Sequence, residues 1–145
     1  MAAAEFLSIA ANNKQSVAWY YLDAPTGETG TVEVTYNGGM TNAGIYVFAA
    51  YNMDNTIIHT VSTGVDVTAN LNTTAGGFAL AAAVAGSSVA GFSGIENIER
   101  QALIPSTSGS PFFRGHQSTD GTSLAMTVSP DGLSTNETIL ALSIY

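Results

Sequence analysis

The chain has 145 residues, which suffice for one domain with a hydrophobic core but not for two ordinary domains. Eleven acidic residues against three basic ones give a formal net charge of -8, and such a surface repels phosphate backbones, which argues against nucleic acid as a partner. The absence of cysteine excludes disulfides, thiolate zinc sites and cysteine nucleophiles.

The first half of the chain contains three segments with the pattern of strands. Residues 1–14 come first and have no basic region followed by a long apolar segment, so they predict no secretory signal. Residues 17–22 are apolar or aromatic on both alternating faces, which predicts a central strand. Residues 31–36 place Val32, Val34 and Tyr36 on one face and polar side chains on the other, which predicts a half-buried strand between turn-forming residues. Residues 43–51 are rich in β-branched and aromatic side chains and predict a third strand.

The second half is a series of short apolar segments separated by turn-forming residues. No apolar run approaches the roughly 20 residues of a membrane-spanning helix, so we expect no membrane partner. Helix-favouring charge occurs only at residues 95–101, where we expect one short helix or turn. Strands are predicted at residues 57–61, 65–71, 78–85, 88–92, 98–104, 112–116, 124–128 and 139–145.

This spacing of strands and turns is typical of an all-β domain. We predict an antiparallel β-sandwich of jelly-roll type with at most one short helix, formed by a single domain over residues 1–145. The apolar phases of the best-patterned strands predict a core that includes Trp19, Val32, Val34, Val47 and Leu142.

Catalytic motifs are weak in this sequence. His59 and His116 are the only imidazoles, and both lie inside predicted strands, where a hydrogen-bonded structural role is the default. The stretch 91–94, which contains Ser93, matches only part of a nucleophile elbow. Glu96 and Glu99 are the closest acidic pair, but their spacing is more typical of a solvated face than of a glycosidase site. We therefore predict no catalytic residue and no enzymatic activity.

Two kinds of binding site are compatible with the loops and strands. Oxygen-rich turns at residues 52–55, 120–122 and 131–132 offer ligands for calcium, although none matches the EF-hand loop and most Asp-Gly pairs are simply turns. Aromatic side chains on a sandwich can stack on sugars, but alternation sends at least half of those between Trp19 and Tyr51 into the core. We expect neither a metal nor another cofactor.

The order of three early segments provides a resemblance to a known class of proteins. The string WYYLDAPTG at residues 19–27 is followed by TVEVTY at 31–36 and by the small and aromatic residues 43–54. This order resembles β-sandwich structural modules of tailed bacteriophages, best over residues 15–93. The resemblance implies a virion role, either in capsid decoration or in the tail, and it carries over no catalytic residue.

We therefore expect a phage virion structural protein, specifically a capsid decoration (cement) protein on the capsid surface, or otherwise an extracellular protein. Its expected partners are the major capsid protein or neighbouring copies of itself, because few charges protect its strand edges and no disulfide stabilises it. The alternative is a carbohydrate-binding or host-adhesion module of a tail or cell-surface protein, which would bind a host-surface glycan.

Overall fold

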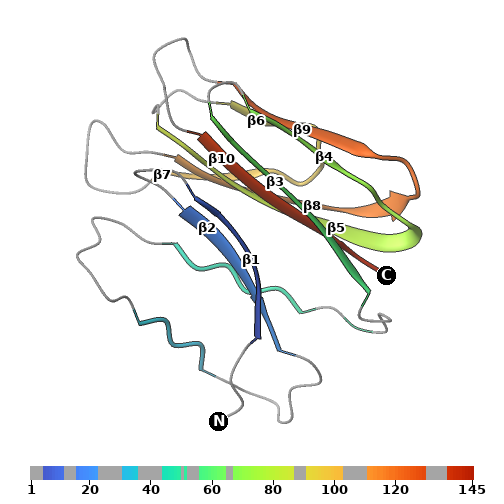
Figure 1. Ribbon diagram of the computed structural model, residues 1–145, viewed down its shortest axis with the longest axis horizontal. Helices are drawn as coiled ribbons and strands as arrows, with labels where there is room; N and C mark the ends of the chain where they lie inside the picture. Colours follow the sequence, from blue (N-terminus) through green and yellow to red (C-terminus); the bar gives the residue numbers. More distant parts are fainter. Residues whose placement is uncertain are drawn as a thin grey trace.

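The computed structural model describes residues 5–11, 16–22, 31–35, 44–49, 51, 56–64, 67–86, 91–102, 111–129 and 137–145, and these form an antiparallel β-sandwich (Figure 1). Within these ranges there is no helix, and so none with the length and apolarity needed to cross a membrane. The strands are β1 (Glu5–Ala11), β2 (Ser16–Tyr21), β3 (Ile57–Gly64), β4 (Thr68–Leu71), β5 (Ala75–Ala85), β6 (Gly91–Ser93), β7 (Glu99–Ala102), β8 (Pro111–Asp120), β9 (Leu124–Ser129) and β10 (Glu137–Ile144).

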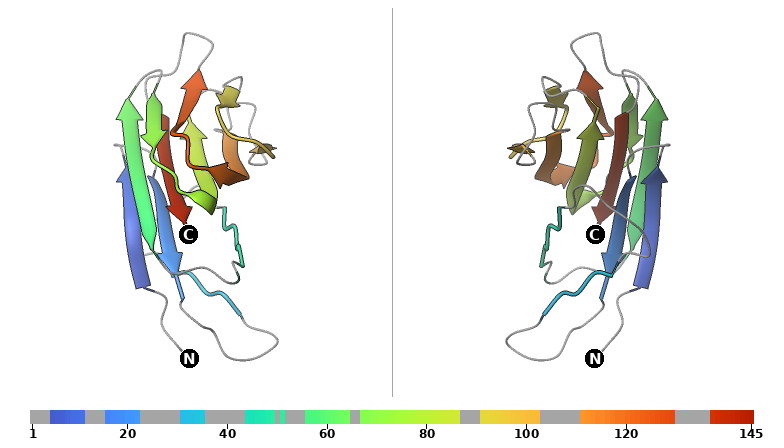
Figure 2. Two further views of the ribbon diagram at one scale, coloured as in Figure 1. Left: turned by 90° about the vertical axis from the view of Figure 1, so that its right-hand side faces the viewer. Right: turned by 90° about the vertical axis from the view of Figure 1, so that its left-hand side faces the viewer.

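The strands form three sheets stacked in layers. The central sheet has the order β3-β10-β5-β8-β7, the sheet on one face has the order β4-β9-β6, and β1 pairs with β2 on the other face (Figures 1 and 2). All seven recorded pairings are antiparallel. The predicted antiparallel β-sandwich is confirmed, whereas the jelly-roll connectivity stays a prediction.

The main core lies between the central sheet and the β4-β9-β6 sheet. Strand β5 contributes a row of fully buried alanines at alternate positions, because small side chains allow the two sheets to approach closely. Larger side chains fill the remaining space, with Phe113 and Ile139 coming from neighbouring strands of the central sheet. The facing sheet contributes Leu71, Phe92, Met126 and Val128. The alanine-rich stretch that has high helix propensity is therefore a strand, as predicted, and packing decides its structure.

A second, smaller core lies on the opposite face of the central sheet. There β10 buries Leu140 and Leu142, and β5 buries Leu80 and Val84. Trp19 of β2 covers this face and donates a hydrogen bond from its indole nitrogen to the Leu140 carbonyl oxygen at 3.3 Å. Burial of Leu142 is confirmed, and Trp19 is half-buried.

The prediction of a buried position is wrong for three of the five expected core residues. Val32, Val34 and Val47 are 58%, 43% and 67% exposed. They belong to residues 31–35 and 44–49, which are extended but pair with no described strand. The half-buried strand predicted at residues 31–36 and the strand predicted at 43–51 are therefore wrong over the described parts of these segments. Alternation alone cannot say whether a sheet is present to receive the apolar face.

Two further differences concern local structure. Strand β1 was not predicted, although it pairs with β2 along its whole length with one irregularity between Phe6 and Ser8. The expected helix or turn at residues 95–101 is a bend at 94–97 followed by β7. Gly94 has φ +89° and a Cβ there would lie 2.0 Å from the Ala125 carbonyl oxygen, so only glycine fits this bend.

Candidate interaction surface

A cluster of aromatic rings covers the half of the central sheet that β1 and β2 leave open. Phe48 lies 5.9 Å from Trp19 and 6.4 Å from His116, measured between ring centroids. His116 of β8 also lies 5.7 Å from Phe78 of β5. Such separations are those of favourable aromatic pairs. Residues 44–49 are thus held beside β2 as a continuation of the outer layer (Figure 2).

Arg114 of β8 anchors the same segment. Its guanidinium carbon lies 4.7 Å from the centre of the Tyr46 ring and 6.0 Å from that of Phe48, within the range of cation–π attraction. Its Nε donates to Glu99 Oε2 at 2.8 Å, and a second guanidinium nitrogen binds the same oxygen, so β7 orients the arginine. Burial raises the pKa of the Tyr46 hydroxyl, an effect that Arg114 opposes and Glu99 reinforces.

The outward face of the outer layer is apolar and exposed. In residues 44–49 the half-buried Tyr46 and Phe48 alternate with Ile45 and Val47, which are 53% and 67% exposed. In β2 the half-buried Trp19 similarly alternates with an exposed neighbour, Tyr20. We define the outward apolar face as the exposed side chains of these two segments: Tyr20, Leu22, Ile45 and Val47. None of them is charged, so the face has the composition of a protein interface core.

Residues 31–35 are the second exposed apolar element. All five residues are exposed, and their valines alternate with Thr31, Glu33 and Thr35. The segment stands off from the three sheets in both Figure 1 and Figure 2. Residues 31–35 pair with no described strand, and an exposed strand edge is a template for pairing with another chain.

A buried carboxylate lies at the start of β10. Glu137 is fully buried, its Oε2 accepts a hydrogen bond from the Val67 backbone N–H at 3.4 Å, and its Oε1 has no hydrogen-bond partner among the described residues. The Ser143 hydroxyl on the same strand is likewise buried without a partner there. Sequence reasoning missed Glu137, because nothing in its neighbourhood along the chain distinguishes it from an exposed acid.

The candidate catalytic residues do not converge. His116 packs between aromatic rings on one face of the central sheet, whereas Ser93 is exposed on β6, which belongs to the sheet on the other face. Phe92 of the partial elbow packs on Phe113 at 5.8 Å and so serves the core. The side chain of His59 lies outside the described part of the structure. No acyl-transfer arrangement forms between Ser93 and His116.

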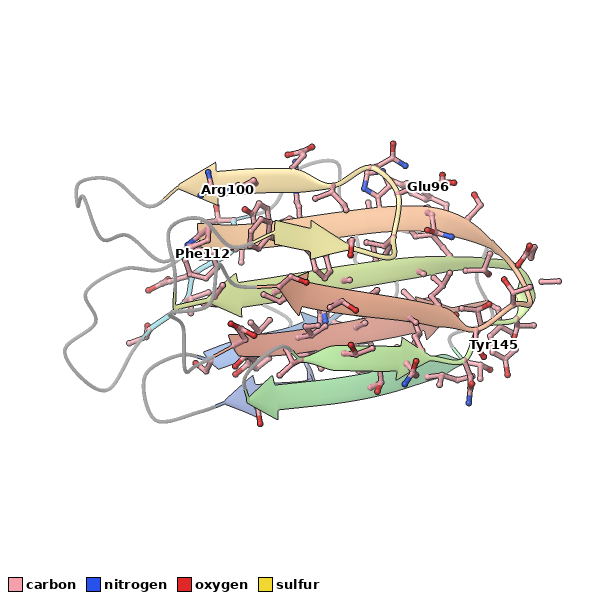
Figure 3. The ribbon with its side chains drawn as sticks, turned by 90° about the horizontal axis from the view of Figure 1, so that it is seen from above. Glu96, Arg100, Phe112 and Tyr145 are labelled. Carbon is pink, nitrogen blue, oxygen red and sulfur yellow. The ribbon has the colours of Figure 1, made fainter. Side chains whose placement is uncertain are left out.

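The acidic pair is divided between two structural roles. Glu96 lies on the connection before β7, at the opposite end from Arg100 (Figure 3), and its backbone binds Gln117 and His116 of β8. Glu99 binds Arg114. Figure 3 also shows Phe112 on β8, and a Cβ at Gly44 would lie in ordinary van der Waals contact with its ring, 4.0 Å away. The exposed Glu96 and the arginine-bound Glu99 therefore do not form a glycosidase pair.

The candidate calcium loop at residues 120–122 is a hydrogen-bonded turn. Asp120 Oδ1 accepts from the Thr122 hydroxyl at 2.7 Å and from its backbone N–H at 2.9 Å, and these bonds lower the pKa of Asp120. The other two candidate loops, 52–55 and 131–132, lie outside the described residues. In the described ranges no three histidine or acidic side chains group closely enough to hold a metal ion.

No protein-family model, curated protein or solved structure matches this chain. The candidate binding surfaces of the chain are the outward apolar face and residues 31–35, which pair with no described strand.

Proposed function

We propose that this chain is a structural protein that works by binding other protein subunits, specifically a decoration protein on the surface of a phage capsid. The observation that carries the binding role is the outward apolar face. Exposed apolar surface on a folded protein often marks the place where a partner binds. The capsid assignment is supported by the ordered resemblance of residues 19–54 to phage structural modules.

The charge distribution supports a protein partner over nucleic acid. Two of the three bases in the chain are Arg100 and Arg114, and Arg114 is engaged by Glu99 and two aromatic rings. A chain with a net charge of -8 offers little for phosphate binding. A non-enzymatic role is part of the same proposal, since Ser93 and His116 lie on opposite sides of the central sheet and Glu99 is bound to Arg114.

The test is association with particles. Phage particles from the source material are separated by density gradient, and the chain is quantified in each fraction by mass spectrometry. We expect many copies per particle in the fractions that contain the major capsid protein. Absence of the chain from all particle fractions would overturn the capsid assignment, and recovery with detached tails would move it to the tail.

Surface variants locate the binding face. We expect Ile45→Asp together with Val47→Asp to abolish rebinding of purified protein to particles stripped of it, because the charges occupy the outward apolar face. The matched control is Ser93→Asp, which adds charge to an exposed position on β6. Equal loss of binding in both variants would contradict the assignment of the face.

Glycan binding is the second candidate function. It is favoured by Tyr20 and Tyr51, which are 59% and 79% exposed and offer ring faces for sugar stacking. Trp19 does not contribute, because its ring faces the central sheet and its N–H is bonded to Leu140. Screening of the purified chain and its Tyr51→Ala variant on a glycan array tests this candidate. A hit that survives Tyr51→Ala unchanged would not support stacking at that position.

A further inference from the structure

The starting observation is that one chain displays two uncovered apolar strand elements. Residues 31–35 are exposed throughout, with Val32 and Val34 on one face. Residues 44–49 are covered on one side only, so Ile45 and Val47 face away from the sheet. Both elements have the alternation of strands, and neither is paired with a described strand. An extended segment gains stability in water when it packs on a second strand or surface.

The two elements differ in how firmly they are held. Residues 44–49 are fixed by Tyr46 and Phe48, which pack on Arg114, Trp19 and His116. Their outward side chains therefore form a preorganised platform. Residues 31–35 have no described ring contact or hydrogen bond that fixes them to the sheets, and they stand clear of the sheets in the figures. Residues 44–49 therefore offer a fixed surface, and residues 31–35 are a segment that could pack on such a surface.

The chemistry of the two elements is complementary. The platform offers Ile45 and Val47. Residues 31–35 offer two valines spaced two residues apart, as strand geometry requires for side chains on one face. The only charge in either segment is Glu33, which alternates onto the face away from the valines. Packing the valine face on the platform therefore buries apolar surface without burying a charge.

We infer that residues 31–35 of one copy pack their valine face on Ile45 and Val47 of a second copy. The inference rests on the proposed function, because it supplies the contact between neighbouring copies of an assembling protein. Since each copy carries both elements, the contact is either reciprocal in a dimer or passes from copy to copy around a closed ring. The occupant of the platform is residues 31–35, supplied by a neighbouring copy.

Cross-linking between single-cysteine variants tests this contact, and the chain helps because it has no cysteine of its own. Val34→Cys with one affinity tag is mixed with Val47→Cys carrying another, and a short bis-maleimide reagent is added. We expect a product that contains both tags. The matched control pairs Val34→Cys with Ser93→Cys, an exposed position on the other side of the sandwich. Equal yields from the two pairs would overturn the inference.

The double variant Val34→Cys/Val47→Cys distinguishes exchange from closure within one chain. We expect dimers and higher species after cross-linking at concentrations where wild type self-associates. A product that is only monomeric would mean that residues 31–35 fold onto their own platform, and the inference would be wrong. No cross-link of either kind, under conditions where both cysteines react with a monofunctional maleimide, would also overturn it.

Sedimentation of charge variants provides an independent measurement. Val32→Asp/Val34→Asp should weaken self-association by about 100-fold, because two valines lose their apolar contact. The control Thr31→Asp/Thr35→Asp adds the same charge to the opposite face of the same segment and should change the dissociation constant by less than about fivefold. Equal weakening by both variants would show that charge, and not the valine face, controls association.

Failure of this inference and failure of the proposed function give different results. If wild type binds capsid particles but no mixed-tag product forms, the copy-to-copy contact is wrong and the decoration role stands. If the mixed-tag product forms but the chain is absent from every particle fraction, the contact stands and the decoration role is wrong.

Discussion

The two sides of the central sheet are built differently, although the same strands supply both. The side facing β4-β9-β6 is closed, with a row of buried alanines from β5 meeting phenylalanine, leucine and methionine side chains. The side facing β2 and residues 44–49 is covered by a thinner layer whose own outer face is apolar and exposed. The closed side holds the larger core, whereas the open side is the one for which we propose contact with another protein. Mutations that act on one side should leave the other unaffected.

The largest effect is expected on the closed side. Phe113 is 2% exposed and packs on Phe92. Phe113→Ala should lower the free energy of unfolding by about 3–5 kcal/mol, since it removes a large buried ring and leaves a cavity. Chemical denaturation measures the change. A loss below about 1 kcal/mol would mean that this interface is loosely packed and that the two sides do not differ as described.

A smaller loss is expected where the thin layer meets the sheet. Trp19 is half-buried and its indole N–H is bonded to Leu140. Trp19→Ala should lower the free energy of unfolding by about 2–3 kcal/mol, because less apolar area is lost than for a fully buried ring. Trp19→Phe is the control that keeps most of the apolar contact. If Trp19→Ala destabilises the chain as much as Phe113→Ala, the outer layer contributes equally to the core.

A gain in stability is expected from the buried acid on the closed side. Glu137→Gln replaces a buried ionisable carboxyl group with a neutral amide and keeps an oxygen that accepts the Val67 N–H, so it should raise the free energy of unfolding by about 1 kcal/mol. Thermal unfolding of wild type and variant measures the difference. Ser143→Ala, which removes the other unpartnered buried group, should be close to neutral. Strong destabilisation by Glu137→Gln would reveal a cationic partner for the carboxylate.

The smallest effect on the isolated chain is expected on the outward face. Val47→Ala should change the free energy of unfolding by less than about 0.5 kcal/mol, because the side chain is exposed. Phe48→Ala, one residue further on, should destabilise more, since that ring packs on Trp19 and His116. Both variants are measured at concentrations below those of self-association. A large loss from Val47→Ala would place this side chain in the core and remove the basis for the proposed contact.

The amino-acid sequence by itself determined the class of the fold and the conformation of most segments. Turn-forming residues at regular intervals and apolar alternation predicted the strands from β2 to β10 within a few residues, because period-two patterning and glycine or proline turns are local properties. The strands predicted at residues 31–36 and 43–51 were wrong, since the described parts of both segments, 31–35 and 44–49, belong to no strand. Composition does not depend on folding, so the sequence alone also excluded disulfides and thiolate sites, through the lack of cysteine, and argued against a nucleic-acid partner, through the acidic net charge.

Only the tertiary structure decided which extended segments join a sheet and which faces are covered. Val32, Val34 and Val47 have the alternating pattern of core residues but are exposed. Glu137 is of a residue type that usually lies at the surface, but it is buried. Strand β1 was missed because its pairing with β2 is a contact between segments and leaves no distinct pattern in either. The physical reason is the same in each case: alternation fixes the direction of a side chain relative to its own backbone, but burial requires a second surface, and the strand order places that surface.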